Sequence, residues 1–195
     1  MDYARTVFPD EFRVLGLRLE TPRIGHALLL QRLGSPFAEL DRKGMDTVRR
    51  GDLAEAMIVL SRPWQRAERL LRSRRGPWLL RWYGLVLGSL ASQILAFDGL
   101  KEFLLLAWGG PKTWVRPVAS TPRRNECLQM LVSVLREKFA MPAQQVYEMP
   151  ICQALWDVCL YLERAGLIEM VDSGDEDLLE KAEQMERELK HGAQG

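Results

Sequence analysis

The sequence predicts an all-α protein: an irregular bundle of about seven or eight helices around a central apolar helix, with a projecting C-terminal helix. Three observations carry this prediction. Apolar residues recur at helical spacing along most of the 195 residues. Proline and glycine separate these segments at the positions where helices begin and end. The hydrophobic content of 47% and the charged content of 27% are those of an ordinary globular protein.

The most apolar stretch is 77–108, and within it residues 82–97 carry no charge. This uncharged run is shorter than the about 20 residues that a membrane-spanning helix needs. Ser89, Ser92 and Gln93 also interrupt it. We therefore expect a buried core helix rather than a membrane span. Asp98-Gly99 is expected to break it, which gives a helical hairpin or a kinked helix.

Turn signals define three helices before this stretch. Thr21-Pro22 is predicted to start the first, which Gly34-Ser35-Pro36 ends. Asp52 is predicted to cap the second, whose residues 53–60 are mostly apolar and therefore expected to be buried. Ser61-Arg62-Pro63 ends that helix and opens a third, amphipathic one.

The second half is punctuated in the same way. Thr121-Pro122 is predicted to start a helix that ends near Ala140, and a short helix is expected at 142–148. A buried helix then follows from Ile151 and stops at Gly166. Ser173 and Glu176 match a capping box that launches a charged helix to about Lys190. Its narrow apolar stripe suits one partner helix and is the predicted partner-binding site: Leu178, Ala182, Met185 and Leu189.

Charge is distributed unevenly between the predicted parts of the chain. These are an extended N-terminal arm (1–20), a helical core with the buried apolar hairpin (21–108), a Gly/Pro linker (109–120) and an acidic helical portion (121–195). Residues 1–120 hold 19 Lys and Arg against 12 Asp and Glu, a net +7, whereas 121–195 hold 8 against 14, a net −6. Opposite charges of this kind orient association, within one chain or between copies.

The sequence shows no set of residues that predicts catalysis, a metal site or a cofactor. His26 lies in an apolar helix, where we expect it to be structural, and His191 lies in a Gly-containing tail. Cys127, Cys152 and Cys159 form no CxxC pair and are expected to be buried thiols in a reducing compartment. No secretion signal is evident, so a cytoplasmic location is expected. We predict that the protein is not an enzyme and has no cofactor or metal.

The strongest electrostatic feature is the stretch 62–81, which contains seven arginines and one acidic residue, Glu68. Four of them form a predicted basic face on one helix: Arg62, Arg66, Arg69 and Arg72. We favour pairing of these arginines with carboxylates, either elsewhere in the chain or on a protein partner. Nucleic acid and an anionic membrane surface are less favoured alternatives, and both stay open.

The order of segments resembles small helical proteins encoded among the tail and morphogenesis genes of tailed bacteriophages and prophages, some of which are taken to be tail assembly chaperones or minor structural components. The resemblance runs from TPRIGHALLLQRLGSPF and GDLAEAMIVLSRPW to MPICQALWDVCLYLERAGLIEM. It has no catalytic residues to transfer. The matching positions are interpreted as caps, turns and packing: Gly25, His26, Ser35-Pro36-Phe37, Gly51-Asp52-Leu53, Met149-Pro150 and Gly166.

The resemblance implies a non-enzymatic protein-interaction role in phage or prophage virion (tail) assembly. The expected partners are other virion structural or assembly proteins, and self-association stays open. The expected location is the cytoplasm of the bacterial host, with association with the virion also open. The alternative is a peripheral membrane or nucleic-acid binding module that uses the Arg62–Arg81 basic face.

Overall fold

The computed structural model describes residues 12–38, 48–111, 113–115 and 127–170. The chain divides into two compact units, one formed by Met1–Gly110 with Pro122–Val158 and the other by Pro111–Thr121 with Cys159–Gly195. Most of the described residues belong to the first unit, which is described below unless the second is named.

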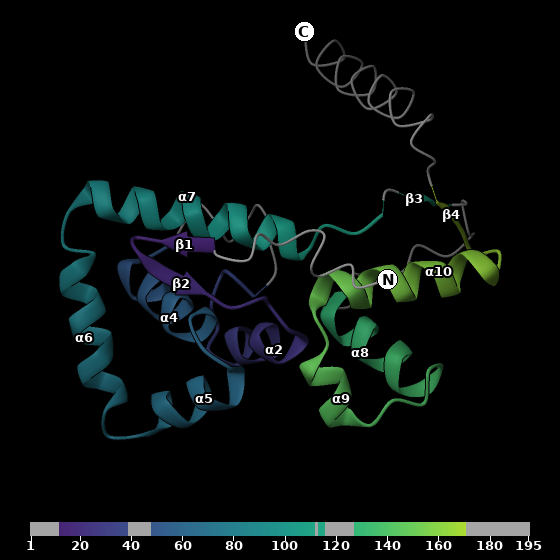
Figure 1. The fold of residues 1–195 in the computed structure, drawn as a ribbon, viewed down its shortest axis with the longest axis horizontal. Coiled ribbons are helices and arrows are strands. Elements are labelled where there is room, and N and C mark those ends of the chain that lie inside the picture. The colour runs from purple at the N-terminus through teal and green to yellow at the C-terminus, as the bar shows by residue number, and fades with distance from the viewer. Residues whose placement is uncertain (1–11, 39–47, 112, 116–126, 171–195) are drawn as a thin grey trace, which may run out of the picture. The chain divides into compact units, whose positions relative to one another are not determined.

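Helices dominate the described residues, as Figure 1 shows. The helices there are α2 (Ile24–Arg32), α4 (Arg50–Leu60), α5 (Trp64–Arg72), α6 (Gly76–Val86), α7 (Leu90–Ala107), α8 (Cys127–Glu137), α9 (Ala143–Glu148) and α10 (Ile151–Arg164). Two small antiparallel sheets pair β1 (Phe12–Val14) with β2 (Leu17–Leu19) and β3 (Thr113–Val115) with β4 (Ile168–Met170). The predicted all-α class is confirmed.

The core forms around α4, which packs against α2, α5, α6 and α7. Residues 56–60 of α4 are at most 1% exposed, because this helix has apolar side chains on all sides. The burial expected for this helix is therefore confirmed. Helix α7 adds Ala96, Leu100, Phe103 and Ala107, which lie at helical spacing on one face, to the same core.

The expectation that residues 82–97 form the buried centre is wrong. Among the described residues, many of the large exposed apolar side chains lie in or beside this stretch, and Leu85 and Leu90 are 76% and 73% exposed. Only Tyr83, Leu87 and Ala96 in this stretch are buried. The apolar composition of residues 82–97 predicted burial. In the structure, however, these residues lie where α6 and α7 meet at a corner (Figure 1), and most of them are at the surface.

The break in this stretch also lies elsewhere than predicted. Helix α7 continues through Gly99, whose Cα approaches β1 so closely that a Cβ there would lie 3.0 Å from Val14 Cγ2. The chain instead turns at Gly88, between α6 and α7, which are bent by 110°. Ser89 caps α7 by accepting a hydrogen bond from the Ser92 N–H, and the Gln93 side chain donates to the Leu87 carbonyl at 2.9 Å.

In the part of the chain that the structure describes, no single helix has the length and apolarity to cross a membrane. The bent pair α6 and α7 meets that requirement by length and composition only.

Two predicted helix starts are shifted by a few residues. Helix α2 begins after Arg23, not at Thr21-Pro22, because the Pro22 carbonyl accepts a hydrogen bond from Ile151 N–H and the Ile24 N–H donates to Met149. Asp52 lies inside the first turn of α4, where its carboxylate accepts a hydrogen bond from the Arg49 N–H at 2.7 Å. It caps the helix from within rather than from the preceding position.

The predicted N-terminal arm contains a hairpin. Strands β1 and β2 pair in antiparallel register through a turn at Leu15 and Gly16, both with positive φ. Val14 and Leu19 are 2% and 4% exposed, so the hairpin covers part of the core. Residues 1–11 lie outside the described part of the chain.

The predicted acidic portion does not belong to one unit, because the boundary between the two units falls within α10, after Val158. Helices α8 and α9 pack on α2 in the first unit, and β4 pairs with β3, from the predicted linker, in the second. The short helix expected at 142–148 is confirmed as α9, and Gly166, with φ of 70°, ends the α10 region as predicted. The predicted start at Thr121-Pro122 and the projecting helix after Ser173 lie outside the described residues.

Candidate functional site

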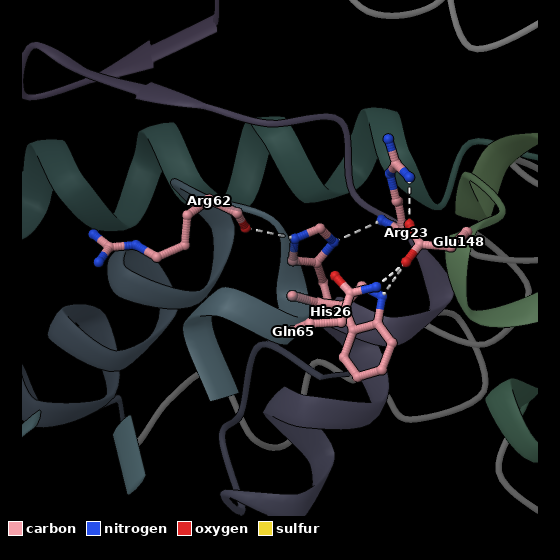
Figure 2. Close-up of polar contacts among 6 residues, drawn as sticks. Arg23, His26, Arg62, Gln65 and Glu148 are labelled. Carbon is pink, nitrogen blue, oxygen red and sulfur yellow. Dashed lines mark hydrogen bonds and ion pairs between the residues drawn. The ribbon is translucent and has the colours of Figure 1, made fainter. Parts of the chain in front are cut away.

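A polar cluster joins three segments that are distant in sequence (Figure 2). We call it the His26–Glu148 cluster, and it comprises Arg23, His26, Arg62, Trp64, Gln65 and Glu148. Its side chains come from the start of α2, the start of α5 and the end of α9. Backbone hydrogen bonds between 22–24 and 149–151 fix the distance between α2 and α9.

His26 is fully buried, and both of its ring nitrogens are occupied by the backbone. The Arg23 N–H donates to Nδ1 at 3.0 Å, so Nε2 carries the proton and donates to the Arg62 carbonyl at 3.0 Å. Burial lowers the pKa of His26 from 6.5 to about 4, despite the opposing effect of the hydrogen bond to Arg62. The ring is therefore neutral at pH 7 and has no nitrogen left to take a substrate proton. It acts as a bridge between α2 and the α4–α5 connection.

Glu148 holds the cluster together through its carboxylate. Oε1 accepts hydrogen bonds from Trp64 Nε1 at 3.1 Å and from the Gln65 amide, and Oε2 accepts one from the Arg23 guanidinium. Burial opposes ionisation of this carboxyl, but the bonds from Gln65 and Arg23 outweigh it and lower the pKa of Glu148. A charged carboxylate with three donors ties α9 to α2 and α5.

Trp64 packs into the space that Gly25 leaves open. A Cβ on Gly25 would lie 2.6 Å from the indole ring, which is closer than any carbon contact allows. Tyr147 contacts the indole ring edge-on, with centroids 5.9 Å apart. A hollow of about 420 Å³ lies beside these residues, and Arg32 and Glu68, which form an ion pair, are among those that line it.

Sequence reasoning assigned no role to Glu148, which lies 125 residues after Arg23. No local motif marks a carboxylate at the end of a short helix as a partner of a distant arginine and indole. The structure thus explains Gly25 and His26, two positions of the sequence resemblance, as packing and bridging residues.

The predicted basic face is present on α5. Arg66, Arg69 and Arg72 are exposed, whereas Arg62 precedes the helix and is half-buried. Only Arg72 forms an ion pair with a described residue, Glu68, which also pairs with Arg32. The acidic segment after residue 170 lies outside the described residues, so the expected pairing of the other arginines with carboxylates elsewhere in the chain or on a partner stays a prediction.

A second surface was not predicted, because its residues were assigned to the core. We call it the α6–α7 apolar surface. Its tryptophans, Trp78 and Trp82, are 67% and 48% exposed. It comprises the exposed apolar side chains of α6 and the first two turns of α7: Trp78, Trp82, Leu85, Val86, Leu90, Ile94 and Leu95.

A groove of about 570 Å³ borders this surface between α4 and α6. Gly51, Ala54 and Gly84 line it, together with Leu85 from the apolar surface. Arg50 and Arg81 also line it, and Glu55, whose pKa burial raises, is the acidic residue among its lining. The α6–α7 apolar surface is thus continuous with a groove that small residues leave open.

The remaining candidate residues are dispersed. Cys152 is buried and Cys159 half-buried, but Cys127 is exposed at the start of α8, so the expected burial of all three thiols is wrong for Cys127. No group of three or more His, Cys, Asp or Glu within the described ranges could hold a metal ion. The predicted partner-binding stripe of Leu178, Ala182, Met185 and Leu189 lies outside those ranges.

Comparison of the chain with protein-family models, with curated proteins and with solved structures found no match.

Proposed function

We propose that the chain is a non-enzymatic protein-interaction protein that acts in phage or prophage virion (tail) assembly, as a chaperone or a minor structural component. The observation that carries the proposal is the α6–α7 apolar surface, which exposes two tryptophans and several aliphatic side chains on a folded protein. The virion setting rests on the sequence resemblance alone.

Large apolar patches on a folded protein usually mark an interaction site. Leu85 and Leu90 lie at the corner between α6 and α7, where two helices can present their side chains to one partner. Tryptophan and arginine are the residues most enriched among those that dominate binding energy. Trp78 and Trp82 lie close in sequence to Arg75 and Arg81, so the surface combines both kinds.

The experiment is co-purification of the full chain with the structural and assembly proteins encoded beside it, at low and at physiological salt. A double variant, Leu85→Ser with Leu90→Ser, is expected to reduce binding at least tenfold, since each truncation removes about 1 kcal/mol or more. The matched control, Leu33→Ser with Met130→Ser, changes exposed side chains on α8 and at the end of α2. Absence of any complex, or equal loss in both variants, would contradict the proposal.

One observation favours a second candidate, a peripheral membrane module. Exposed tryptophans beside basic residues are typical of proteins that bind anionic membrane surfaces. Arg74, Arg75 and Arg81 flank Trp78 and Trp82 in sequence, and all five side chains are exposed. Co-sedimentation with vesicles of anionic lipid, and with DNA, separates this candidate from the first. Binding that is lost on Arg74→Glu, Arg75→Glu and Arg81→Glu would favour it, and binding to neither vesicles nor DNA would exclude it.

A further inference from the structure

Three arginines along α5 and at the start of α6 lack acidic partners among the described residues. Arg66, Arg69 and Arg75 form no ion pair with any described residue, and the carboxylate of Glu68 is already shared by Arg32 and Arg72. Arg69 makes one hydrogen bond, from Nε to the Gln65 carbonyl at 3.3 Å. Three exposed guanidinium groups are therefore available to carboxylates from outside the described chain.

These arginines lie around a shallow, widely open depression, which we call the arginine hollow. The arginine hollow has a volume of about 650 Å³ and is lined by Arg66, Arg69, Leu70, Ser73 and Arg75. Ser73 orders the turn between the two helices, since its hydroxyl donates to the Leu70 carbonyl at 2.7 Å and accepts from the Arg75 N–H at 3.2 Å. Leu70, which is half-buried, is the apolar residue of this lining, and three of the other lining residues are arginines.

The chain itself contains a segment of matching chemistry. Residues 172–190 hold eight Asp and Glu against three Lys and Arg, a net −5. At 3.6 residues per turn, the apolar stripe predicted for this segment has Glu186 on one side and Glu188 on the other. Glu180 and Glu183 fall on the opposite face. A helix of this pattern presents one narrow apolar ridge between two carboxylates.

We propose that the arginine hollow of one copy binds segment 172–190 of a second copy. Leu70 would contact the apolar stripe, while guanidinium groups of the hollow pair with Glu186 and Glu188, in the bidentate geometry that arginine makes with carboxylates. The two surfaces are different, so the interface is heterologous, and a pair of copies keeps one unused hollow on one copy and one unused segment on the other. Copies therefore add head to tail, to form a ring or an open chain.

The proposal predicts how the mass of the purified full chain behaves in solution. Light scattering should show a mass above that of one chain, 22.4 kDa, that grows with protein concentration. Because the interface depends on exposed charges, its affinity should fall on the order of tenfold between 0.05 and 0.5 M salt. A chain that stays monomeric at millimolar concentration and low salt would overturn the proposal.

Two variants, each with charged side chains replaced by glutamine, test whether the interface is head-to-tail or symmetric. The hollow variant, Arg66→Gln with Arg69→Gln, and the segment variant, Glu186→Gln with Glu188→Gln, should each be monomeric. Mixed in equal amounts, they should form a dimer and nothing larger, since only one intact hollow and one intact segment can meet. A symmetric interface predicts instead that the mixture stays as weak as either variant alone, and that result would overturn the proposal.

Controls with the same change in charge exclude a general electrostatic effect. Glu180→Gln with Glu183→Gln alters the opposite face of the predicted helix, and Arg136→Gln with Lys138→Gln alters exposed residues at the end of α8. Both controls should associate like the unchanged chain, and association as weak as that of the test variants would contradict the assignment. No other protein is present in these measurements, so the result is independent of the partner of the α6–α7 apolar surface.

Discussion

Trp82 and Tyr83 are adjacent in α6 and touch edge-on, with ring centroids 5.1 Å apart, yet Tyr83 is 5% exposed and Trp82 is 48% exposed. Helix α6 thus has apolar side chains on both its inner and its outer side. The inner side packs against α4, and the outer side belongs to the α6–α7 apolar surface. The outer side contributes little to folding and is available for binding.

Truncation of equally apolar residues should therefore have unequal effects on stability. Leu60→Ala, in α4, is expected to lower the free energy of unfolding by about 2–5 kcal/mol, because the side chain is fully buried. Leu90→Ala is expected to change it by less than about 0.5 kcal/mol. Urea denaturation followed by circular dichroism measures both. Similar losses for the two variants would mean that Leu90 is buried in the folded protein.

Glycine substitutions should separate close packing from open space. Gly25→Ala places a methyl group against Trp64, so the indole must move, and we expect a loss of about 1–3 kcal/mol. Gly51→Ala in α4 meets nothing within 4 Å and is expected to be neutral or to stabilise by up to about 1 kcal/mol. Thermal unfolding of the two variants tests the contrast. Equal melting temperatures would contradict the contact between Gly25 and Trp64.

Stability should fall in mild acid because of His26. Burial lowers its pKa from 6.5 to about 4, so between these values the unfolded chain binds the proton more tightly than the folded one. The contribution of His26 is present above about pH 6.5 and is lost as the pH falls toward 4, by about 3 kcal/mol in all.

Denaturation at a series of pH values measures this slope. His26→Gln is expected to be less stable at pH 7 but to lose most of the pH dependence between 6.5 and 4. A slope that is unchanged in the variant would assign the titration to another group.

Glu148 should contribute to stability through the hydrogen bonds by which it joins α9 to α2 and α5. Glu148→Gln keeps the shape but turns an amide toward Arg23, and we expect a loss of about 1–2 kcal/mol at pH 7. The ionised carboxylate of Glu148 stabilises the fold, and this contribution is lost as the pH falls through its lowered pKa. The difference between the variant and the unchanged chain should therefore vanish in strong acid. Glu137→Gln, exposed on α8, is the control and should change stability by less than about 0.5 kcal/mol. Equal effects of the two changes would contradict the role of Glu148.

Helix boundaries set by local chemistry could be predicted from the sequence. Gly34 and Gly166 end their helices with φ near 70°, and Pro142 precedes α9 as expected. The position of Gly99 shows the limit of this reasoning. A glycine inside an apolar pattern looks like a break, but here it allows Val14 of a distant strand to approach, which only the tertiary structure shows.

The candidate surfaces were harder to predict for a related reason. Helices α4 and α6 both have apolar sequences, yet the second half of α4 is buried among α2, α5, α6 and α7, whereas α6 is covered on one side only. Composition does not tell how many neighbours a helix has. The unpaired arginines of α5 could likewise be seen only once Glu68 was found to be shared by Arg32 and Arg72.

Hydroxyl-radical footprinting of the full chain, alone and with its binding partner, tests the central claim most directly. The α6–α7 apolar surface predicts rapid oxidation of Trp78, Trp82, Leu85 and Leu90 in the chain alone, at rates well above those of Leu60 and Leu100. In a complex, the rates of the first four should fall while Met130 on α8 stays unchanged. Slow oxidation of Trp78 and Leu85 in the chain alone would contradict the account, because these side chains would then lie in the core.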